Sequence, residues 1–131
     1  MDTSGLVLKV VVHSAAIQDR DGAKQVLTGC HEQFPRLEKV WVDQGYRGQL
    51  VNWAKSECGL TIEVVQKTPE QQDKKGFAVQ AHRWVVERTF AWLGRYRRLA
   101  KDYDLLPQTS ETWVYLAMTH LMLKRLTKTT K

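Results

Sequence analysis

Apolar and polar positions follow one another along the chain in blocks that predict a mixture of strands and helices. The nearly continuous, β-branched stretch GLVLKVVVHSA predicts a well-covered strand over residues 6–13. An acidic start followed by apolar residues at helical spacing predicts a helix over residues 19–34, closed by Pro35. The segment LEKVWVDQGYRG then predicts a second strand that stops at Asp43, before a turn bracketed by glycines.

The chain after residue 48 predicts further elements of both kinds. QLVNWAKSECG predicts a helix that ends at Gly59, and LTIEVVQK predicts a third strand. TPEQQDKKG carries Pro, Gly and charge without a large apolar side chain, so residues 68–78 are expected to form a surface loop. Two helices, over residues 79–101 and 111–128, complete the chain on either side of Pro107.

This order of elements predicts the fold class. Strands that alternate with helices indicate an α/β layer whose sheet is partly parallel, and 131 residues suffice for one domain with one core. In such sheets functional groups gather at the carboxyl ends of the strands. Asp43 is expected to lie at such an end.

Charge is distributed unevenly along the chain. Its formal net charge is +6, which favours an anionic partner. Residues 1–79 hold ten basic and ten acidic side chains, whereas residues 80–131 hold ten basic and four acidic ones. The positive field is therefore expected to belong to the C-terminal third.

Several classes of protein are disfavoured by what the sequence lacks. Its two cysteines have neither CxxC spacing nor a histidine cluster beside them, which argues against a zinc site or a disulfide framework. No secretory signal is recognisable at the N-terminus, so the expected location is the cytoplasm. The most apolar window, residues 112–123, is too short to span a bilayer, and no membrane partner is expected.

An acidic residue stands inside the helix HRWVVERTFAWLGRYRRL, which is apolar enough to be buried. At about 100° per residue, Glu87 shares its face with Arg83, Ala91 and Gly94. The small neighbours leave room for a bulky ligand, and the basic residues that follow would favour a phosphate chain. A simpler alternative is an Arg83 to Glu87 ion pair one helical turn apart.

Asp43 also has two interpretations. An Asp before a Gly-rich turn often makes an Asx turn or caps the next helix. Yet a carboxylate at a strand end and another on a late helix, Glu87, can converge on hard divalent cations. Two such cations could activate a hydroxyl and stabilise the leaving oxygen of a phosphodiester, and a third carboxylate would complete the set.

Three segments in sequence order carry a resemblance that extends from Asp2 to about Leu126: DTSGLVLKVVVHSAAIQDRDGA, VWVDQGYRG and HRWVVERTFAWLGRYRRLAKDYD. Together they resemble the C-terminal catalytic half of DDE-class bacterial insertion-sequence transposases, in the insertion sequence 4 and 5 superfamily. The resemblance implies a ribonuclease H-like fold, a layered sheet with flanking helices. It also implies one catalytic domain over residues 1–131.

The resemblance implies a metal site as well. In this family two aspartates and a glutamate hold two Mg²⁺ or Mn²⁺ ions, and these acids fall on Asp2, Asp43 and Glu87. The family pattern Y-x2-R-x3-E-x6-K is met at Arg83 and Glu87. Gln80 stands at its Tyr position and Gly94 at its Lys position.

The first acid raises a structural question, because in this fold it lies on the central strand and the chain begins one residue before Asp2. The domain is therefore expected to be truncated at that strand, and three outcomes stay open: the elements repack, another chain supplies the strand, or the protein is an unstable remnant. As a terminal residue, Asp2 is expected to be mobile. Asp19 and Asp21 could substitute for it, although helix capping is the favoured role for both.

The expected partner is DNA, at the ends of the insertion sequence and at its target. The residues expected to contact DNA are Tyr46, Arg47, Arg83, Arg88, Arg95, Arg97, Arg98 and Lys101. The leading hypothesis is a transposase that cleaves and transfers DNA strands with the help of metal ions. The alternatives are a noncatalytic DNA-binding fragment or remnant that competes with the full-length enzyme, and a structural protein in which Glu87 and the arginines are only a solvated helix face. Besides DNA, a second copy of the chain or full-length transposase is a possible partner.

Overall fold

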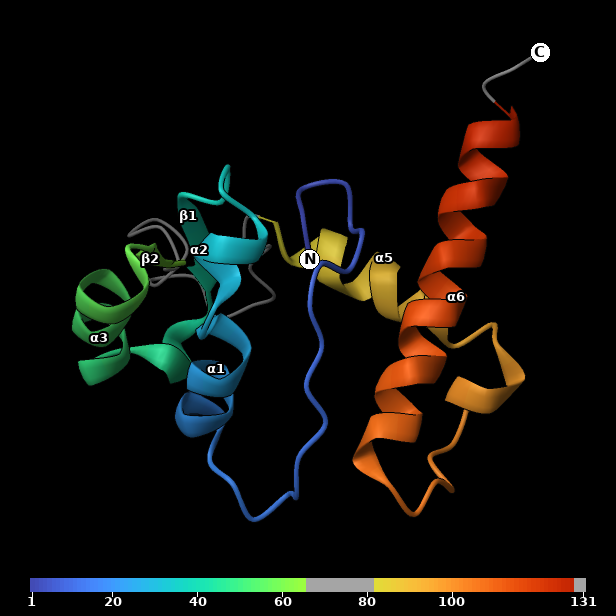
Figure 1. Ribbon diagram of the computed structural model, residues 1–131, viewed down its shortest axis with the longest axis horizontal. Helices are drawn as coiled ribbons and strands as arrows, with labels where there is room; N and C mark the ends of the chain where they lie inside the picture. Colours follow the sequence, from blue (N-terminus) through green and yellow to red (C-terminus); the bar gives the residue numbers. More distant parts are fainter. Residues whose placement is uncertain (66–81, 129–131) are drawn as a thin grey trace, which may run out of the picture. The chain divides into compact units, whose positions relative to one another are not determined.

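The computed structural model describes residues 1–65 and 82–128, and the chain divides into two compact units. We call Ser14–Ala81 the central unit, and Met1–His13 together with His82–Lys131 the terminal unit. Figure 1 shows the order of the elements along the chain. The predicted loop at residues 68–78 lies outside the described residues, and the single domain over residues 1–131 stays a prediction.

The central unit holds a small parallel sheet. Its elements are α1 (Asp19–Leu27), α2 (Cys30–Gln33), β1 (Lys39–Val42), the 3-10 helix η1 (Gln44–Tyr46), α3 (Gln49–Cys58) and β2 (Thr61–Val64). The two strands pair in parallel from Lys39 opposite Thr61 to Val42 opposite Val64. A parallel pair needs a long crossover, which α3 provides. The prediction of an α/β arrangement with a parallel sheet is confirmed in this coarse form.

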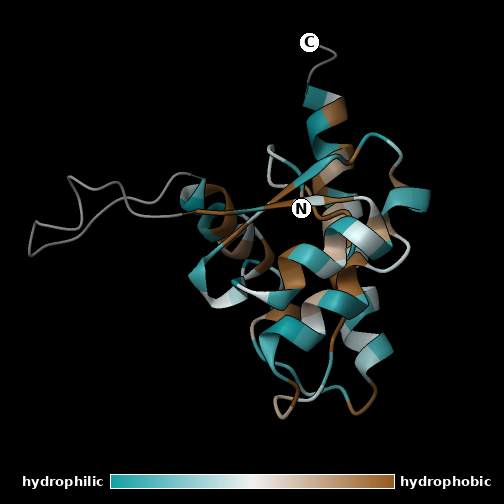
Figure 2. Cartoon of the chain, turned by 90° about the vertical axis from the view of Figure 1, so that its left-hand side faces the viewer, coloured by the Kyte–Doolittle hydropathy of each residue, from teal (hydrophilic) through white to brown (hydrophobic). Residues whose placement is uncertain are grey.

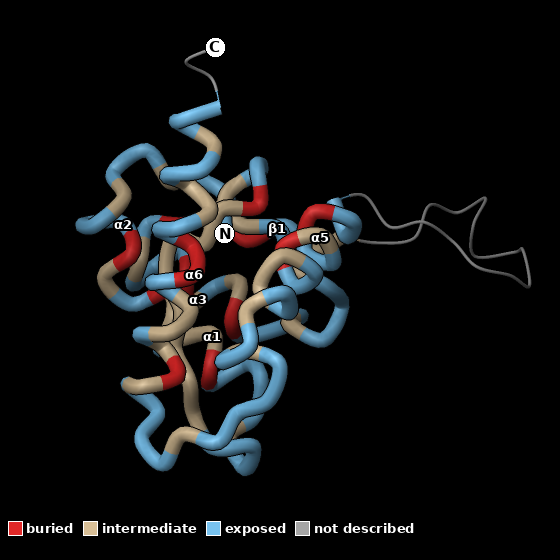
Figure 3. Tube along the Cα trace, turned by 90° about the vertical axis from the view of Figure 1, so that its right-hand side faces the viewer, coloured by how far each residue is buried: buried red, intermediate tan, exposed pale blue. Residues whose placement is uncertain are grey.

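An apolar cluster forms the core of the central unit. It consists of Leu27, Cys30, Leu50, Ala54, Leu60 and Ile62, all at most 7% exposed. Leu50 and Ala54 lie one turn apart, so α3 turns one face toward the cluster. Gly59 ends α3 in the left-handed conformation, with φ of 64°, as its position in the sequence predicts. Figure 3 marks these buried positions along the trace.

The prediction of one continuous helix over residues 19–34 is wrong, because the structure has two helices there. α1 ends at Leu27, and Gly29 adopts φ of 72°, which interrupts the helix before the short α2 begins at Cys30. Glycine enters this conformation at little steric cost, so the break occurs at Gly29, the second of the two glycines in this stretch.

The terminal unit contains α5 (Arg83–Leu93), the 3-10 helix η2 (Arg97–Leu99) and α6 (Pro107–Lys128). Residues 79–81 of the predicted helix lie outside the described residues, and its predicted end at residue 101 is wrong, because α5 stops at Leu93. Tyr96 is extended instead, and its hydroxyl lies 3.0 Å from Nδ1 of His120 on α6. α6 begins earlier than predicted, at Pro107, whose fixed φ suits the first helical position.

The predicted strand at residues 6–13 is also wrong. Within the described residues, this segment belongs to no sheet. Its backbone is bound by side chains of α6: the Val10 N–H donates to the Tyr115 hydroxyl at 3.1 Å and the Val12 N–H to the Glu111 carboxylate at 2.8 Å. The two side chains thus accept the hydrogen bonds that the carbonyl groups of a neighbouring strand would otherwise accept.

α5 is less buried than its apolar composition predicts. Trp84 is 55% and Phe90 is 65% exposed, and the buried positions of the helix are Val85 and Thr89.

The hydropathy colours of Figure 2 show how apolar and polar stretches follow one another within the helices. Among the helices of residues 1–65 and 82–128, none combines the length and the apolar character that crossing a membrane requires.

Candidate functional site

Asp43 directly follows β1, at its carboxyl end, as predicted. Its Oδ1 accepts a hydrogen bond from the Gly45 N–H at 2.9 Å, and Asp43 is the N-cap of η1. The interpretation of Asp43 as an Asx turn and cap is therefore confirmed. Because the residue is exposed and this bond engages one oxygen, the carboxylate keeps a second oxygen for a ligand.

Tyr46 and Arg47 lie in the loop after Asp43. Tyr46 is half-buried against the apolar cluster, whereas Arg47 is exposed. Burial raises the pKa of the Tyr46 phenol, and the nearby carboxylates of Asp19 and Asp43 raise it further. The hydroxyl therefore stays protonated at neutral pH and can donate a hydrogen bond to an anion such as a phosphate.

Asp19 and Asp21 lie in the first turn of α1, and neither provides a side-chain cap for this helix. Asp21 instead pairs with Lys24 at 3.4 Å. The predicted capping role is wrong for both residues, although a carboxylate in the first turn still interacts favourably with the helix dipole.

Asp2, in the terminal unit, holds a compact loop. Its Oδ1 accepts from the N–H groups of Ser4 at 2.9 Å and Leu6 at 2.8 Å. Its own N–H donates to the Leu6 carbonyl at 2.8 Å, and its carbonyl accepts from the Gly5 N–H at 3.0 Å. These four hydrogen bonds close residues 2–6 into a loop, and the expected mobility of Asp2 stays a prediction.

This loop packs on α5. The Thr89 hydroxyl donates to the Gly5 carbonyl at 2.8 Å, and Nη2 of Arg88 donates to the Ser4 carbonyl at 2.9 Å. Thr89 is fully buried, and Gly5 is buried as well. Two of the three predicted acids, Asp2 and Glu87, thus belong to a loop and a helix in direct contact.

Glu87 lies on an exposed face of α5. Its Oε1 accepts from Nε of Arg83 at 3.0 Å, and the two side chains are 64% and 58% exposed. The simpler interpretation of this pair, an ion pair one turn apart, is therefore confirmed. Such a pair contributes only a few tenths of a kcal/mol, so a multivalent cation could displace Arg83 at little cost.

The three carboxylates offer oxygen donors of the type that Mg²⁺ and Mn²⁺ prefer. In the described part of the chain, one oxygen of each accepts the hydrogen bonds given above and the other accepts none. The donor chemistry therefore fits a divalent cation. Within residues 1–65 and 82–128, however, no three His, Cys, Asp or Glu side chains lie close enough together to hold a metal ion.

The basic residues expected to contact DNA fall into two groups. Arg95, Arg97 and Lys101 are exposed between α5 and α6, and Arg98 lies over the Trp113 ring at 5.2 Å. Arg88 differs, because its guanidinium lies between the rings of Trp84 and Trp92, at 4.4 and 4.7 Å. The sequence grouped Arg88 with the other basic residues, because the local pattern does not indicate that its guanidinium donates to the carbonyl of Ser4, 84 positions away.

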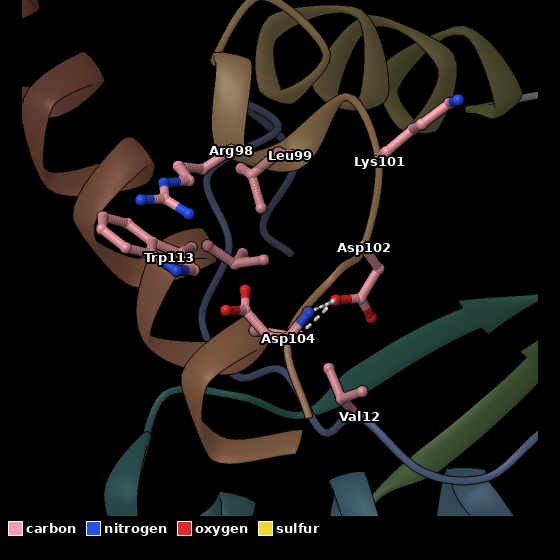
Figure 4. A pocket seen from close by; sticks show the side chains of 9 residues that line it. Val12, Arg98, Leu99, Lys101, Asp102, Asp104 and Trp113 are labelled. Atoms are coloured by element: carbon pink, nitrogen blue, oxygen red, sulfur yellow. Dashed lines mark hydrogen bonds between the residues drawn. The ribbon is translucent and has the colours of Figure 1, made fainter. Parts of the chain in front are cut away.

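A cavity of about 180 Å³ lies in the terminal unit, between η2 and the start of α6 (Figure 4). Arg98 and Lys101 line it together with Asp102 and Asp104. Oδ1 of Asp102 accepts from the Ser110 hydroxyl at 2.8 Å and from the Asp104 N–H at 3.2 Å. These contacts fix the connection that leads into α6.

Known proteins resemble the chain over most of its length. Residues 40–124 match a family model described as "Transposase DDE domain", a stretch that includes Asp43 and Glu87. Over 78 residues the chain is 33% identical to a candidate transposase for insertion sequence element IS402 from Burkholderia cepacia. That alignment covers 60% of this chain and 34% of the relative, so the chain matches about a third of that protein. No solved structure matches the chain significantly.

Proposed function

Because the chain belongs to the family of transposase DDE domains, we propose that it carries out the chemistry of an insertion-sequence transposase. The reaction is metal-dependent cleavage of a DNA phosphodiester bond, followed by attack of the freed 3′-hydroxyl on target DNA. The observation that carries this proposal is the family match over residues 40–124, which spans an acid at a strand end and an acid on a helix.

The metal ligands in this proposal are Asp2, Asp43 and Glu87, with two Mg²⁺ or Mn²⁺ ions as cofactors. Asp43 stands at the carboxyl end of β1, Glu87 stands on the exposed face of α5, and Asp2 lies in the loop that packs on α5. Bound divalent ions lower the pKa of an attacking hydroxyl and stabilise the charge of the leaving oxygen. The protein contributes the carboxylate oxygens and their orientation.

The DNA-binding residues in this proposal surround these acids in the sequence. They are Tyr46, Arg47, Arg83, Arg88, Arg95, Arg97, Arg98 and Lys101. The exposed cations can neutralise backbone phosphates, and the protonated Tyr46 hydroxyl can donate to one. Such contacts position a duplex and read no sequence.

The finer features implied by the sequence form part of the same proposal. They are a ribonuclease H-like layered sheet, membership of the insertion sequence 4 and 5 superfamily, one catalytic domain made of both units, and action in the cytoplasm on element ends and target DNA. Association with a second copy or with full-length transposase would supply further contacts to DNA.

Cleavage tests the catalytic part of the proposal. Supercoiled plasmid DNA is incubated with the wild-type chain and Mn²⁺, with and without EDTA, beside Glu87→Gln and Asp43→Asn. We expect nicked plasmid that depends on the metal and on both carboxylates. Glu57→Gln, at an exposed acid of α3, is the matched control and should nick normally. Equal nicking by the wild type and both carboxylate variants would contradict the assignment.

Salt dependence tests the DNA-binding part. Affinity for a duplex should fall steeply between low and moderate salt, because neutralised phosphates release counterions. An Arg97→Ala, Arg98→Ala double variant should flatten the slope by about one to two phosphate contacts. Lys55→Ala, at an exposed position of α3 within residues 1–79, which carry no net charge, should leave the slope unchanged. An unchanged slope in the double variant would exclude these arginines as phosphate contacts.

A second candidate function is DNA binding without catalysis. The observation that favours it is that no three metal-binding side chains cluster within the described residues. This candidate predicts the same salt dependence as the catalytic proposal. It predicts no metal-dependent nicking, so the plasmid assay separates the two.

A further inference from the structure

Arg88 is surrounded by groups of its own unit. Trp84 and Trp92 stand one turn before and one turn after it on α5, and its guanidinium carbon lies 4.4 and 4.7 Å from their ring centroids. Its Nη2 donates to the Ser4 carbonyl at 2.9 Å, and its buried Nε has no hydrogen-bond partner among the described residues. With a ring near it on either side, this guanidinium is poorly placed to meet a phosphate.

Thr89, the next residue, binds the same loop. Its side chain is fully buried, and its hydroxyl lies 2.8 Å from the Gly5 carbonyl and 3.0 Å from the Val85 carbonyl, which share its one proton. A Cβ on Gly5 would lie 2.6 Å from the Thr89 hydroxyl and 3.2 Å from the Trp92 ring. The loop backbone therefore lies directly on α5, and only glycine allows so close an approach.

The carbonyls that α5 binds belong to the same turn that the Asp2 carboxylate binds. Oδ1 of Asp2 accepts from the N–H groups of Ser4 and Leu6, and α5 donates to the carbonyls of Ser4 and Gly5. A shift of the loop on the helix would therefore move the Asp2 carboxylate with it. Glu87 immediately precedes Arg88 on the same helix.

From these contacts we propose that Arg88 and Thr89 are positioning residues, which hold the Asp2 loop on α5 and so fix where the Asp2 carboxylate stands when it binds a divalent cation. This inference rests on the proposed function, because it takes Asp2 and Glu87 as metal ligands. Groups that orient metal ligands typically change metal affinity about 10–100-fold when they are altered. Arg88 thereby leaves the set of phosphate contacts.

Mn²⁺ binding measured by calorimetry tests this inference on the whole folded chain. Thr89→Val keeps the shape of the side chain and removes the hydroxyl, whereas Arg88→Lys keeps the charge and removes the planar group that stacks between the rings. We expect both variants to bind Mn²⁺ about 10-fold or more weakly than the wild type. Thr89→Ser keeps the hydroxyl and should bind Mn²⁺ as tightly as the wild type.

Two measurements separate positioning from loss of stability. Met118→Ala removes a buried side chain of α6, at 1% exposed, and should lower thermal stability without weakening Mn²⁺ binding. Hydrogen exchange at the amides of Ser4 and Leu6, which the Asp2 carboxylate accepts from, should accelerate in Thr89→Val and Arg88→Lys but not in Met118→Ala. If Thr89→Val does not fold, Arg88→Lys provides the same test.

The results distinguish failure of this inference from failure of the proposed function. Mn²⁺ binding that requires Glu87 but is equal in the wild type, Thr89→Val and Arg88→Lys would overturn the positioning role and leave the metal site intact. Absence of Mn²⁺ binding by the folded wild type, or binding unchanged in Glu87→Gln, would overturn the metal site and the positioning role together.

Discussion

The central and terminal units are stabilised by different kinds of contact. Among its described residues, the central unit buries six apolar residues in one cluster, from Leu27 on α1 to Ile62 on β2. Among the described residues of the terminal unit, the buried side chains include two polar ones, Thr89 and Ser110, and large apolar side chains such as Phe90 stay exposed. Its segments are joined by hydrogen bonds such as that from Arg88 to Ser4, and by the Arg125 guanidinium of α6, which lies 4.4 Å from the Trp92 ring of α5.

Because of this difference, the two units hold their candidate acids in place by different contacts. Asp43 follows β1, whose register is fixed by the apolar core. A slip of one residue would turn the apolar side chains of the strand to the wrong face of the sheet. Asp2 and Glu87 depend on a few directional bonds between a loop and a helix. Apolar cores respond most to loss of volume, whereas polar contacts respond most to loss of a single partner. Variants can therefore probe the two units separately.

Leu60→Ala should have the largest effect on stability. Leu60 is fully buried between α3 and β2, so truncation leaves a cavity that costs about 2–5 kcal/mol of unfolding free energy. Leu105→Ala, at a side chain 95% exposed, should change stability by less than about 0.5 kcal/mol. Denaturant unfolding measures both, and equal effects would mean that the apolar cluster is not the core of the central unit.

Gly5→Ala should have an effect of similar size, and it probes the terminal unit. Gly5 has φ of 80°, and a Cβ there would lie 2.6 Å from the Thr89 hydroxyl. Gly59→Ala is the matched control, because Gly59 has φ of 64° and open space around it. The strained backbone costs each variant about 1–2 kcal/mol, and overpacking should add about 1–3 kcal/mol at Gly5 alone. Thermal unfolding that gave equal losses would show that the loop does not lie on α5.

Tyr46→Phe should change the pH dependence of stability. Burial raises the pKa of Tyr46, with a further contribution from Asp19 and Asp43, so the folded state keeps this proton at pH values where the unfolded chain releases it. The stability contributed by the protonated phenol is full below pH of about 10 and is lost as pH rises through the folded pKa. Unfolding followed at increasing alkaline pH should show this loss in the wild type and not in Tyr46→Phe. Tyr103→Phe, at a side chain 82% exposed, should keep the wild-type profile.

Arg83→Gln should have the smallest effect. The Arg83 to Glu87 pair is more than half exposed on both sides, so its loss should cost about 0.5 kcal/mol or less. Denaturant unfolding at low salt measures the change. A loss above about 1 kcal/mol would mean that Glu87 is committed to this ion pair, which would weaken its assignment as a metal ligand.

The sequence predicted the central unit better than the terminal unit for a physical reason. Local signals specify β1, α3 with its glycine stop, and β2, because apolar periodicity and turn residues act over a few positions. The errors arose where a distant partner decides: residues 6–13 look like a strand because they are β-branched, yet α6 side chains bind their backbone. The break at Gly29 was visible as a glycine but was outweighed by the apolar spacing around it.

The candidate site shows the same division. Resemblance to the transposases named Asp2, Asp43 and Glu87, and local chemistry named the Asx turn of Asp43 and the Arg83 to Glu87 pair, both of which are present. The contacts of Arg88 and Thr89 with Ser4 and Gly5 could not be predicted, since they join positions 84 residues apart. The glycine of DTSG was the one local signal, because it indicates a close approach without naming the partner.

Calorimetric titration of the folded chain with Mn²⁺, run beside Glu87→Gln and Asp43→Asn, tests the central claim most directly. Both variants keep the size of the side chain and remove its charge. We predict that the wild type binds Mn²⁺ and that each variant loses this binding, because both carboxylates are ligands. A folded wild type that binds no Mn²⁺, or that binds it as tightly as both variants do, would contradict the claim and reduce Glu87 to the ion-pair partner of Arg83.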